Sequence, residues 1–303
     1  MPRPQTIEEF HAAMAKLASP EGRGRGLAFK PRETDVIISP YGKSGTTMLQ
    51  QMVHTLRTGG DVAHEDISAV VPWLETSTDV GIDIDAEQRA NPRAFKSHLS
   101  YDLVPKGGRY IVSLRDPKDA LVSAYRFMEG WYFEPGSISM DEFAQDGYLS
   151  RPLERSYWGH FLSWWNQRDN PSVLLLAYEN ILSEKTETIR RVADFIGVPM
   201  DEQLLAITEE HTSLEFMLRH KHLFDDKLMR DRSEQVAGLP PNGDSAKVRK
   251  GRVGEHQHEL SSAIGDAMDA IWRERVTAAV GLATYADASA ALSLNNSVQV
   301  PKP

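Results

Sequence analysis

The segment KSGTT, within the stretch SPYGKSGTTM at Ser39–Met48, combines a lysine with three hydroxyl side chains. Gly42 and Gly45 would let the backbone curl closely around a ligand. Ser44–Thr47 would form the first turn of a helix, whose free N–H groups and dipole favour an anion. Lys43 adds a mobile positive charge that can follow charge developing on an oxygen. The stretch therefore predicts a site for a phosphate-like group.

One position separates this loop from the P-loop that binds nucleoside triphosphates. The P-loop pattern has a glycine five residues before Gly42, and this chain has Ile37 there. A P-loop kinase or other nucleotide phosphotransferase should carry the full glycine loop, need magnesium and have a carboxylate at the end of a strand. That class stays the alternative interpretation.

Further polar residues follow three other short apolar runs. Lys96 and His98 stand at the end of one run, and Arg115 follows the next. Tyr178 follows the last. Ligands of open parallel sheets bind outside the carboxyl ends of the strands, so these side chains should meet Lys43 at one edge. The expected result is an anion site with a titratable base.

Four apolar runs, separated by helical patterns, are the strands expected to position these residues. Strands are predicted at Asp35–Ser39, Arg93–Ser97, Arg109–Leu114 and Val173–Ala177. Helices are expected from Met48 to Leu56 with a stop at Gly59, from Pro117 after the capping residue Asp116, and over Arg151–Arg168, Ser183–Ile196 and Glu259–Val280. This alternation predicts an α/β fold with a central, mostly parallel sheet flanked by helices and a P-loop-like strand–loop–helix at the donor site.

The chain reads as one domain over residues 1–282, with an appendage at 283–303. This appendage is rich in alanine and serine, so it is expected to be loosely attached or disordered. Arg23–Gly26 and Gly238–Ser245 are expected to be surface loops. The segment before them should form a short amphipathic helix instead of a secretion signal.

Composition limits the classes of function. With a formal net charge of −9, the chain is a poor candidate for binding nucleic acid or an anionic membrane through its general surface. The lack of cysteine excludes disulfides and a thiol nucleophile. No run approaches the ~20 apolar residues that cross a bilayer. A cytoplasmic protein with a small-molecule partner, no nucleic acid and no membrane is the simplest expectation.

Five separated motifs resemble the PAPS-dependent cytosolic-type sulfotransferases, where PAPS is 3′-phosphoadenosine 5′-phosphosulfate. In order along about Asp35 to Gly254 they are YGKSGTT, FKSHLS, SLRDPKDALVSAYRF, HTSLEFM and RKGRVGEH. The resemblance implies transfer of a sulfuryl group from PAPS to an acceptor hydroxyl or amine, with PAP as the second product. It also implies that no metal is required, because the moving sulfuryl group carries less negative charge than a phosphoryl group.

The resemblance assigns catalytic roles to three residues. His98 would be the general base, because imidazole titrates near neutrality. Lys43 would stabilise the bridging oxygen, and Lys96 would bind sulfuryl or 5′-phosphate oxygens. The donor-binding set would be Lys43, Ser44, Gly45, Thr46, Thr47, Met48, Arg115, Ser123, Tyr178, Thr212, Leu214, Arg249, Lys250 and Gly251.

Within that donor-binding set, two positions depart from the family pattern. Met48 and Leu214 stand where relatives usually place aromatic residues against the adenine. A thioether and an aliphatic side chain still pack on a ring, but part of the ~1–3 kcal/mol of stacking per base would be lost. Weaker PAPS affinity than in members with an aromatic sandwich is therefore expected.

The acceptor pocket and the oligomeric state are less defined by the resemblance. Trp73, Phe127, Trp131, Tyr132 and Phe133 lie in segments that line the acceptor cavity of relatives, which suggests an apolar or aromatic acceptor. The family's short dimer motif is represented at best by Gln257, Ser261-Ser262 and Asp266. A monomer, or a dimer that does not use this motif, is expected.

Each assignment has a structural alternative. A histidine after a strand can simply be a hydrogen-bonding residue, and Arg115 can form a surface ion pair with Asp116. The pocket aromatics can be ordinary core residues. The pairs His220/His222 and His256/His258 are expected to be surface histidines and not metal ligands. A noncatalytic PAPS- or PAP-binding module is the third functional class, which a blocked acceptor cavity would favour.

Overall fold

The computed structural model describes residues 2–241, 245, 247–249 and 251–293. Its centre is a four-stranded, all-parallel sheet in the order β2-β1-β3-β4. The strands are β1 (Val36–Ile38), β2 (Ala94–Lys96), β3 (Arg109–Leu114) and β4 (Val173–Ala177). The predicted bounds of β3 and β4 are confirmed, and β1 and β2 are one residue shorter at each end.

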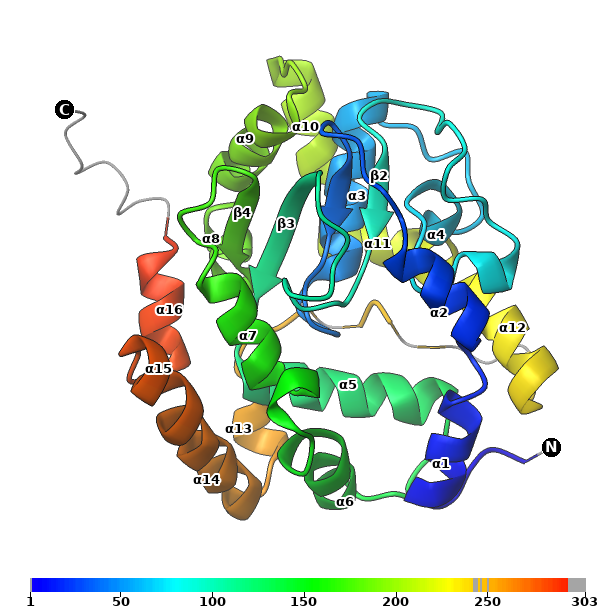
Figure 1. The fold of residues 1–303 in the computed structure, drawn as a ribbon, viewed down its shortest axis with the longest axis vertical. Coiled ribbons are helices and arrows are strands. Elements are labelled where there is room, and N and C mark those ends of the chain that lie inside the picture. Colours follow the sequence, from blue (N-terminus) through cyan, green and yellow to red (C-terminus); the bar gives the residue numbers. More distant parts are fainter. Residues whose placement is uncertain (1, 242–244, 246, 250, 294–303) are drawn as a thin grey trace.

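Helices cover both faces of the sheet and form one hydrophobic core on each face. Successive strand residues point to opposite faces, so neighbouring residues of β1 belong to different cores. Val36 and Ile38 belong to a core with α3 (Thr46–Thr58), α8 (Tyr178–Ser183), α9 (Lys185–Ile196), α10 (Glu202–His211) and α11 (Leu214–Arg219). Ile37 belongs to the other core, with α5 (Pro117–Trp131) and α7 (Tyr157–Trp165). The predicted sheet flanked by helices is confirmed. The carboxyl ends of the strands face α5 (Figure 1).

The remaining elements surround this centre. They are α1 (Ile7–Met14), α2 (Pro20–Leu27), α4 (Ile67–Val70), α6 (Met140–Ala144), α12 (Lys227–Ala237), α13 (His256–Glu259), α14 (Ser262–Ile271), α15 (Ala278–Val280) and α16 (Tyr285–Ala291). Short 3-10 turns lie at Thr78–Val80, Leu153–Arg155 and Lys221–Phe224, and π-helical turns at Gln145–Leu149 and Trp272–Thr277. No helix within the described ranges is long and apolar enough to span a bilayer.

Helix boundaries follow local capping chemistry. As predicted, Asp116 caps α5 by accepting from the Lys118 N–H, and Gly59 ends α3 in the left-handed conformation. The prediction of a loop at Arg23–Gly26 is wrong, because these residues lie in α2. Ser19 caps that helix. Gly26 of α2 allows close packing, because a Cβ there would lie 2.2 Å from the Leu74 carbonyl oxygen.

Residues 283–293 belong to the folded domain, contrary to the loose attachment expected from residue 283. The side chain of Tyr285 is buried, and its hydroxyl donates to Glu179 and to the Leu114 carbonyl. Ala288 is fully buried on the same helix, α16. These contacts anchor α16 beside β4. Residues 294–303 lie outside the described residues.

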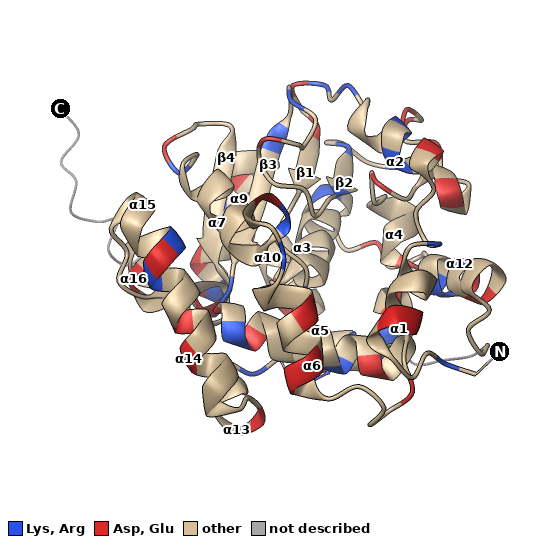
Figure 2. Cartoon of the chain, turned by 60° about the horizontal axis from the view of Figure 1, so that its bottom comes forward, with Lys and Arg blue, Asp and Glu red and all other residues tan. Residues whose placement is uncertain are grey.

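Charged side chains of both signs are spread over the outer helices (Figure 2). The first turns of α1 and α6 are acidic, with Glu8, Glu9, Asp141 and Glu142. Acidic residues in a first turn suit the positive end of the helix dipole. The cations that could bind an anionic ligand are concentrated instead inside the molecule, around the cavity described next.

Candidate active site

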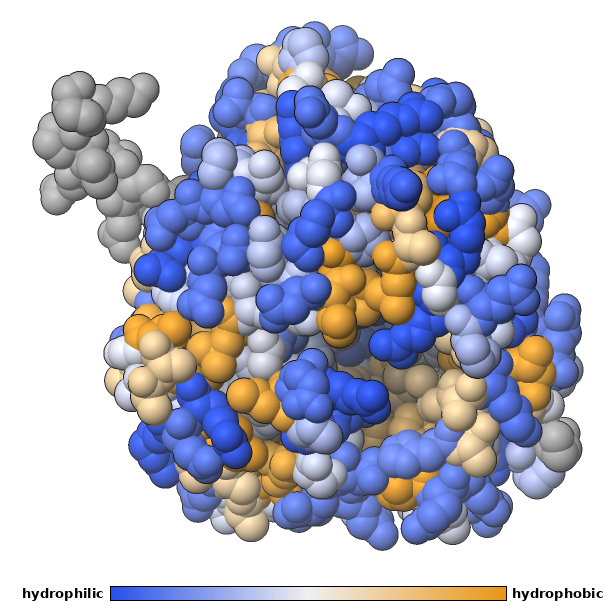
Figure 3. All heavy atoms as spheres, in the orientation of Figure 1, coloured by the Kyte–Doolittle hydropathy of each residue, from blue (hydrophilic) through white to orange (hydrophobic). Residues whose placement is uncertain are grey.

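A cavity of about 580 Å³ opens beyond the carboxyl ends of the strands. The space-filling view shows the surface hollowed over α5, with apolar side chains on part of the wall (Figure 3). The cavity brings together nearly all the residues that the sequence singled out: Lys43, Gly45, Thr46, Thr47, Met48, Trp73, Lys96, His98, Arg115, Ser123, Phe127, Trp131, Tyr132, Tyr178, Thr212, Leu214, Arg249 and Gly251.

Two of the predicted residues that the structure describes, Ser44 and Phe133, do not line this cavity. Ser44 lies under the loop, where its carbonyl accepts a hydrogen bond from the Ser113 hydroxyl. Phe133, predicted as an acceptor-pocket residue, is instead fully buried and packs against Phe10 and Phe143. It follows Tyr132 directly, and neighbouring residues at a helix end point in different directions. Lys250 lies outside the described residues.

The loop after β1 has the backbone geometry of an anion cradle. Lys43 has a φ of 68° and Gly45 a φ of 94°, so two left-handed residues curl the chain before α3. Gly45 also leaves no room for a side chain, because a Cβ there would lie 2.8 Å from the Tyr178 ring. The residue before α3 is Gly45, which has no side chain to cap the first turn of the helix. The N–H groups of that turn can therefore bind an anion.

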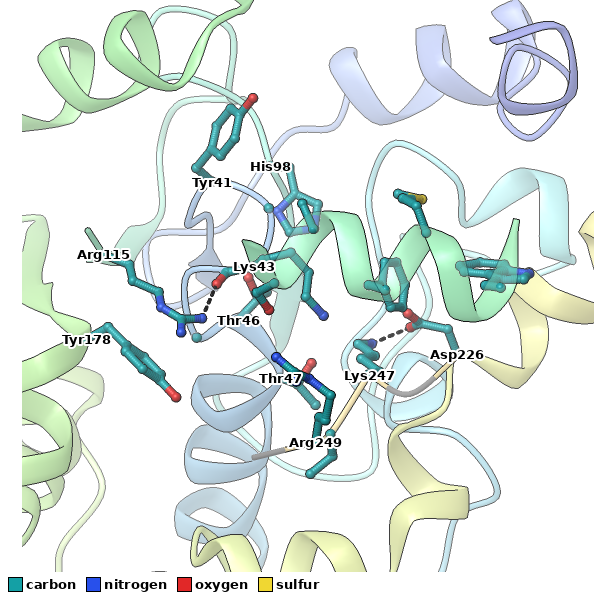
Figure 4. Close-up of a pocket in the computed structure, with 18 of the residues that line it drawn as sticks. Tyr41, Lys43, Thr46, Thr47, His98, Arg115, Tyr178, Asp226, Lys247 and Arg249 are labelled. Carbon is teal, nitrogen blue, oxygen red and sulfur yellow. Dashed lines mark hydrogen bonds and ion pairs between the residues drawn. The ribbon is translucent and has the colours of Figure 1, made fainter. Parts of the chain in front are cut away.

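Buried polar atoms without partners lie around this cradle. Arg115 donates to the carbonyls of Lys43 (2.9 Å) and Arg252 (3.2 Å), and its guanidinium carbon lies 4.5 Å from the centre of the Tyr178 ring (Figure 4). Its Nε has no hydrogen-bond partner in the described structure, and the hydroxyl of Thr46 has none either. Buried donors usually have partners, so these atoms fit a bound anion such as a phosphate.

Two lysines extend from neighbouring strand ends into the cavity. The Lys43 ammonium lies 4.1 Å from the centre of the Phe127 ring, and that of Lys96 lies 4.0 Å from the Trp73 ring. Lost hydration, with nearby cations, lowers the pKa of Lys43 to about 7. Lost hydration also lowers the pKa of Lys96 to about 8. An anionic ligand would favour their charged forms.

His98 is held in the tautomer that a general base requires. Its Nδ1 lies 2.8 Å from the carbonyl oxygen of Pro40, and its backbone N–H donates to Glu75. Burial, and then the charge of Lys96, lower the pKa of the imidazole to about 3, so the ring is neutral near pH 7. Since a carbonyl only accepts, Nδ1 carries the hydrogen and Nε2 has the free lone pair.

Several cavity residues were not predicted from the sequence. The helix α1 contributes Phe10, His11 and Met14, and a buried ion pair joins Asp226 to Lys247. The amphipathic pattern of α1 indicated that one face of this helix is buried, but it did not indicate which part of the protein that face packs against. The sequence had no local signal for the ion pair, because its two residues are far apart and neither belongs to a recognised motif.

One histidine of each pair has a structural partner. His256 Nδ1 lies 2.7 Å from a carboxylate oxygen of Asp119, and this hydrogen bond raises the pKa of His256. The rings of His220 and Phe216 lie 4.3 Å apart. Within the described ranges, no three His, Cys, Asp or Glu residues are grouped so that they could hold a metal ion.

A family model covers most of the chain. The model described as "Sulfotransferase domain" matches residues 33–279. The chain belongs to the sulfotransferase family. This membership confirms the family resemblance of the five motifs and does not favour the kinase alternative.

Named sulfotransferases are similar to this chain over most of its length. It is 25% identical to human sulfotransferase 1C2 over 281 residues, which covers 89% of this chain and 92% of the relative. It is 27% identical to the luciferin sulfotransferase of Photinus pyralis over 266 residues, 78% of this chain and 70% of the relative.

Solved structures share the fold at lower identity. A mouse sulfotransferase in complex with PAP has a TM-score of 0.65 and 21% identity, over 86% of this chain and 91% of the other. A retinol dehydratase in complex with androsterone and PAP has a TM-score of 0.64 and 20% identity, over 88% of this chain and 85% of the other. These similarities confirm the predicted α/β fold.

Proposed function

We propose that this sulfotransferase transfers the sulfuryl group of PAPS to the hydroxyl or amine of a small, apolar or aromatic acceptor. The observation that carries the proposal is one cavity in which a neutral His98 lies with two lysines beside an uncapped helix N-terminus. That set offers a base for the acceptor proton and positive groups for the anion, which are the two requirements of the reaction.

The donor would lie across the strand ends. Thr46, Thr47 and the N–H groups of the first turn of α3 would bind the 5′-phosphosulfate, with Lys43 at the bridging oxygen. Arg115, whose Nε lacks a partner, would bind the 3′-phosphate with Ser123 and the late loop of Arg249, Lys250 and Gly251. The adenine would lie among Tyr178, Thr212, Met48 and Leu214, which all line the cavity.

The chain's own groups would then carry the chemistry. PAPS supplies an activated sulfuryl group. His98 Nε2 would take the acceptor proton, while Lys43 and Lys96 would stabilise charge on the bridging and sulfuryl oxygens. Positioning and electrostatics would supply most of the rate, as in phosphoryl transfer.

Apolar rings line part of the cavity. Phe127, Trp131 and Tyr132 come from α5 and its end, Trp73 from the segment after α4, and Phe10 from α1. An apolar or aromatic acceptor would bury its surface against these rings, with few polar groups to fix its orientation. The cavity is open, which argues against a binding-only module with a blocked acceptor side.

Calorimetry with PAP, PAPS, ATP and GTP, with and without magnesium, tests the donor assignment. PAP and PAPS are expected to bind without magnesium, and ATP and GTP to bind far more weakly. Tight, magnesium-dependent ATP binding with no PAP binding would contradict the proposal. A screen of phenols, aliphatic alcohols, amines and sugars with labelled PAPS then identifies the acceptor class.

Met48→Trp is expected to tighten PAP binding by up to about tenfold. An indole ring stacks on a base with ~1–3 kcal/mol, and the thioether of Met48 already supplies part of that contact. Calorimetric Kd values for PAP check this expectation. Leu218→Trp, at an exposed position outside the cavity, is the control and should leave the Kd unchanged. An unchanged or weaker Kd for Met48→Trp would count against adenine at this position.

A further inference from the structure

A buried ion pair faces the two lysines of the cavity. Lys247 Nζ lies 2.5 Å from Asp226 Oδ1, and only 9% and 5% of the two side chains are exposed. Asp226 is the residue before α12, and Lys247 lies in the segment that leads to Arg249. Both residues line the cavity, and Figure 4 shows them on the side toward which the Lys43 side chain extends.

Stability alone does not account for this ion pair. The free energy lost when two charges leave water is about as large as the free energy gained from their attraction, so buried ion pairs stabilise a fold only weakly. The buried pair Asp35–Arg93 is different, because its arginine also binds the carbonyls of Asp85 and Ala86 and so ties segments together. Among the described residues, Asp226 is the one hydrogen-bond partner of the Lys247 ammonium. Its other hydrogens remain for a ligand.

The charges of this pair act directly on the transfer lysines. Lys43 faces Lys247, Asp226, Arg115 and Lys96, and of these only Asp226 raises its pKa. Lys96 is likewise affected by Asp226 and Lys247, and by the carboxylates of Asp66 and Glu75. The three ammonium groups therefore lie within electrostatic range of one another, and Asp226 acts on Lys43 and Lys96 and pairs with Lys247.

We propose that Lys247 is a third cationic group of the sulfuryl-transfer site and that Asp226 is the positioning residue that holds it there. This inference rests on the proposed function. In the step, the acceptor oxygen or nitrogen forms a bond to sulfur while the bond from sulfur to the bridging phosphate oxygen breaks. The electron pair of the broken bond stays on that phosphate oxygen, and the acceptor proton goes to His98 Nε2. Lys247 binds the sulfuryl oxygens during the transfer.

Lys247→Met is expected to lower kcat by about 10²-fold, the usual effect of losing one donor to a charge that develops in the transition state. The Kd for PAP, which has no sulfuryl group, should change by less than about threefold. Lys247→Arg should recover part of the lost kcat. Near-normal kcat in Lys247→Met, or an equal loss of kcat and PAP affinity, would overturn the assignment.

The pH profile of kcat/KM for PAPS gives a readout that a merely structural role would not move. Removing the Lys247 cation should raise the pKa of Lys43, so the alkaline fall of the profile moves to higher pH. Asp226→Asn removes the anion and should move the same fall to lower pH. Asparagine is chosen because the backbone of Asp226 is left-handed, with a φ of 48°. Shifts of the same sign, or no shifts, would contradict the proposal.

The neighbouring pair Lys227–Asp231 supplies a matched control. Its atoms also lie 2.5 Å apart, but about half of each side chain is exposed, and neither residue lines the cavity. Lys227→Met and Asp231→Asn should leave kcat and the profile unchanged. If a variant with one substitution in the buried pair unfolds, the double variant Asp226→Asn/Lys247→Met replaces it. The double variant leaves no uncompensated buried charge, and its kcat should still be lowered. Wild-type protein that does not bind PAP would refute the proposed function itself.

Discussion

Replacing His98 by alanine is expected to lower kcat by about 10²–10⁴-fold, the usual contribution of a positioned general base. The free Nε2 of the neutral ring is the acceptor that would take the proton, and alanine offers none. The donor does not depend on the imidazole, so the Kd for PAP should stay near the wild-type value. Steady-state kinetics and calorimetry on the same preparations check both expectations.

His222→Ala is the control for the His98 substitution. His222 is exposed and does not line the cavity, so its loss should leave kcat unchanged. The hydrogen bond from His98 to the Pro40 carbonyl is also lost in the alanine variant, so thermal unfolding should be recorded in parallel. Near-normal turnover by a folded His98→Ala protein that binds PAPS would exclude His98 as the base.

Lys43→Met is expected to lower kcat/KM for PAPS by about 10³-fold or more, because the variant loses charge stabilisation in the transition state and part of the donor binding. Unlike the His98 variant, it should also weaken the binding of PAP. Loss of PAP affinity without loss of kcat would restrict Lys43 to a binding role.

The pH dependence of kcat/KM tests whether the reaction requires the charged form of Lys43. The pKa of Lys43 is lowered to about 7 by burial and nearby cations, so the reactive ammonium form is present below this pH and lost above it. Lys96, with a pKa of about 8, loses its proton next. We expect kcat/KM for PAPS to fall about tenfold per pH unit on the alkaline side. Lys43→Arg, whose charge persists at high pH, should delay this fall.

The acidic side of that profile should be flat over a wide range. The imidazole of His98 has a pKa of about 3 in the free protein, so it stays neutral and able to accept a proton well below pH 7. An acidic limb near the ordinary histidine value would mean that the free-protein pKa of His98 is not the relevant one.

Part of the cavity lining could be predicted because Lys43, Lys96 and Arg115 stand at or soon after the ends of strands. A buried parallel strand is recognisable as a short apolar run, and the carboxyl ends of such strands meet at one edge of the sheet. Lys43, Lys96 and Arg115 needed no further information to be brought together. The core position of Phe133 could not be predicted, because a run of aromatic residues does not reveal which ring faces a cavity and which faces the core.

The sequence of neighbouring residues thus determined the strands, the anion-binding loop before α3 and the residues that follow each strand. These features depend on apolar periodicity, glycine positions and capping residues within a few positions of one another. Contacts between distant segments were decided only by the tertiary structure. The placement of α1 against the cavity, the anchoring of α16 by Tyr285 and the pairing of Asp226 with Lys247 are examples. Each depends on which surfaces meet once the sheet and its helices have packed, and no short stretch of sequence contains that information.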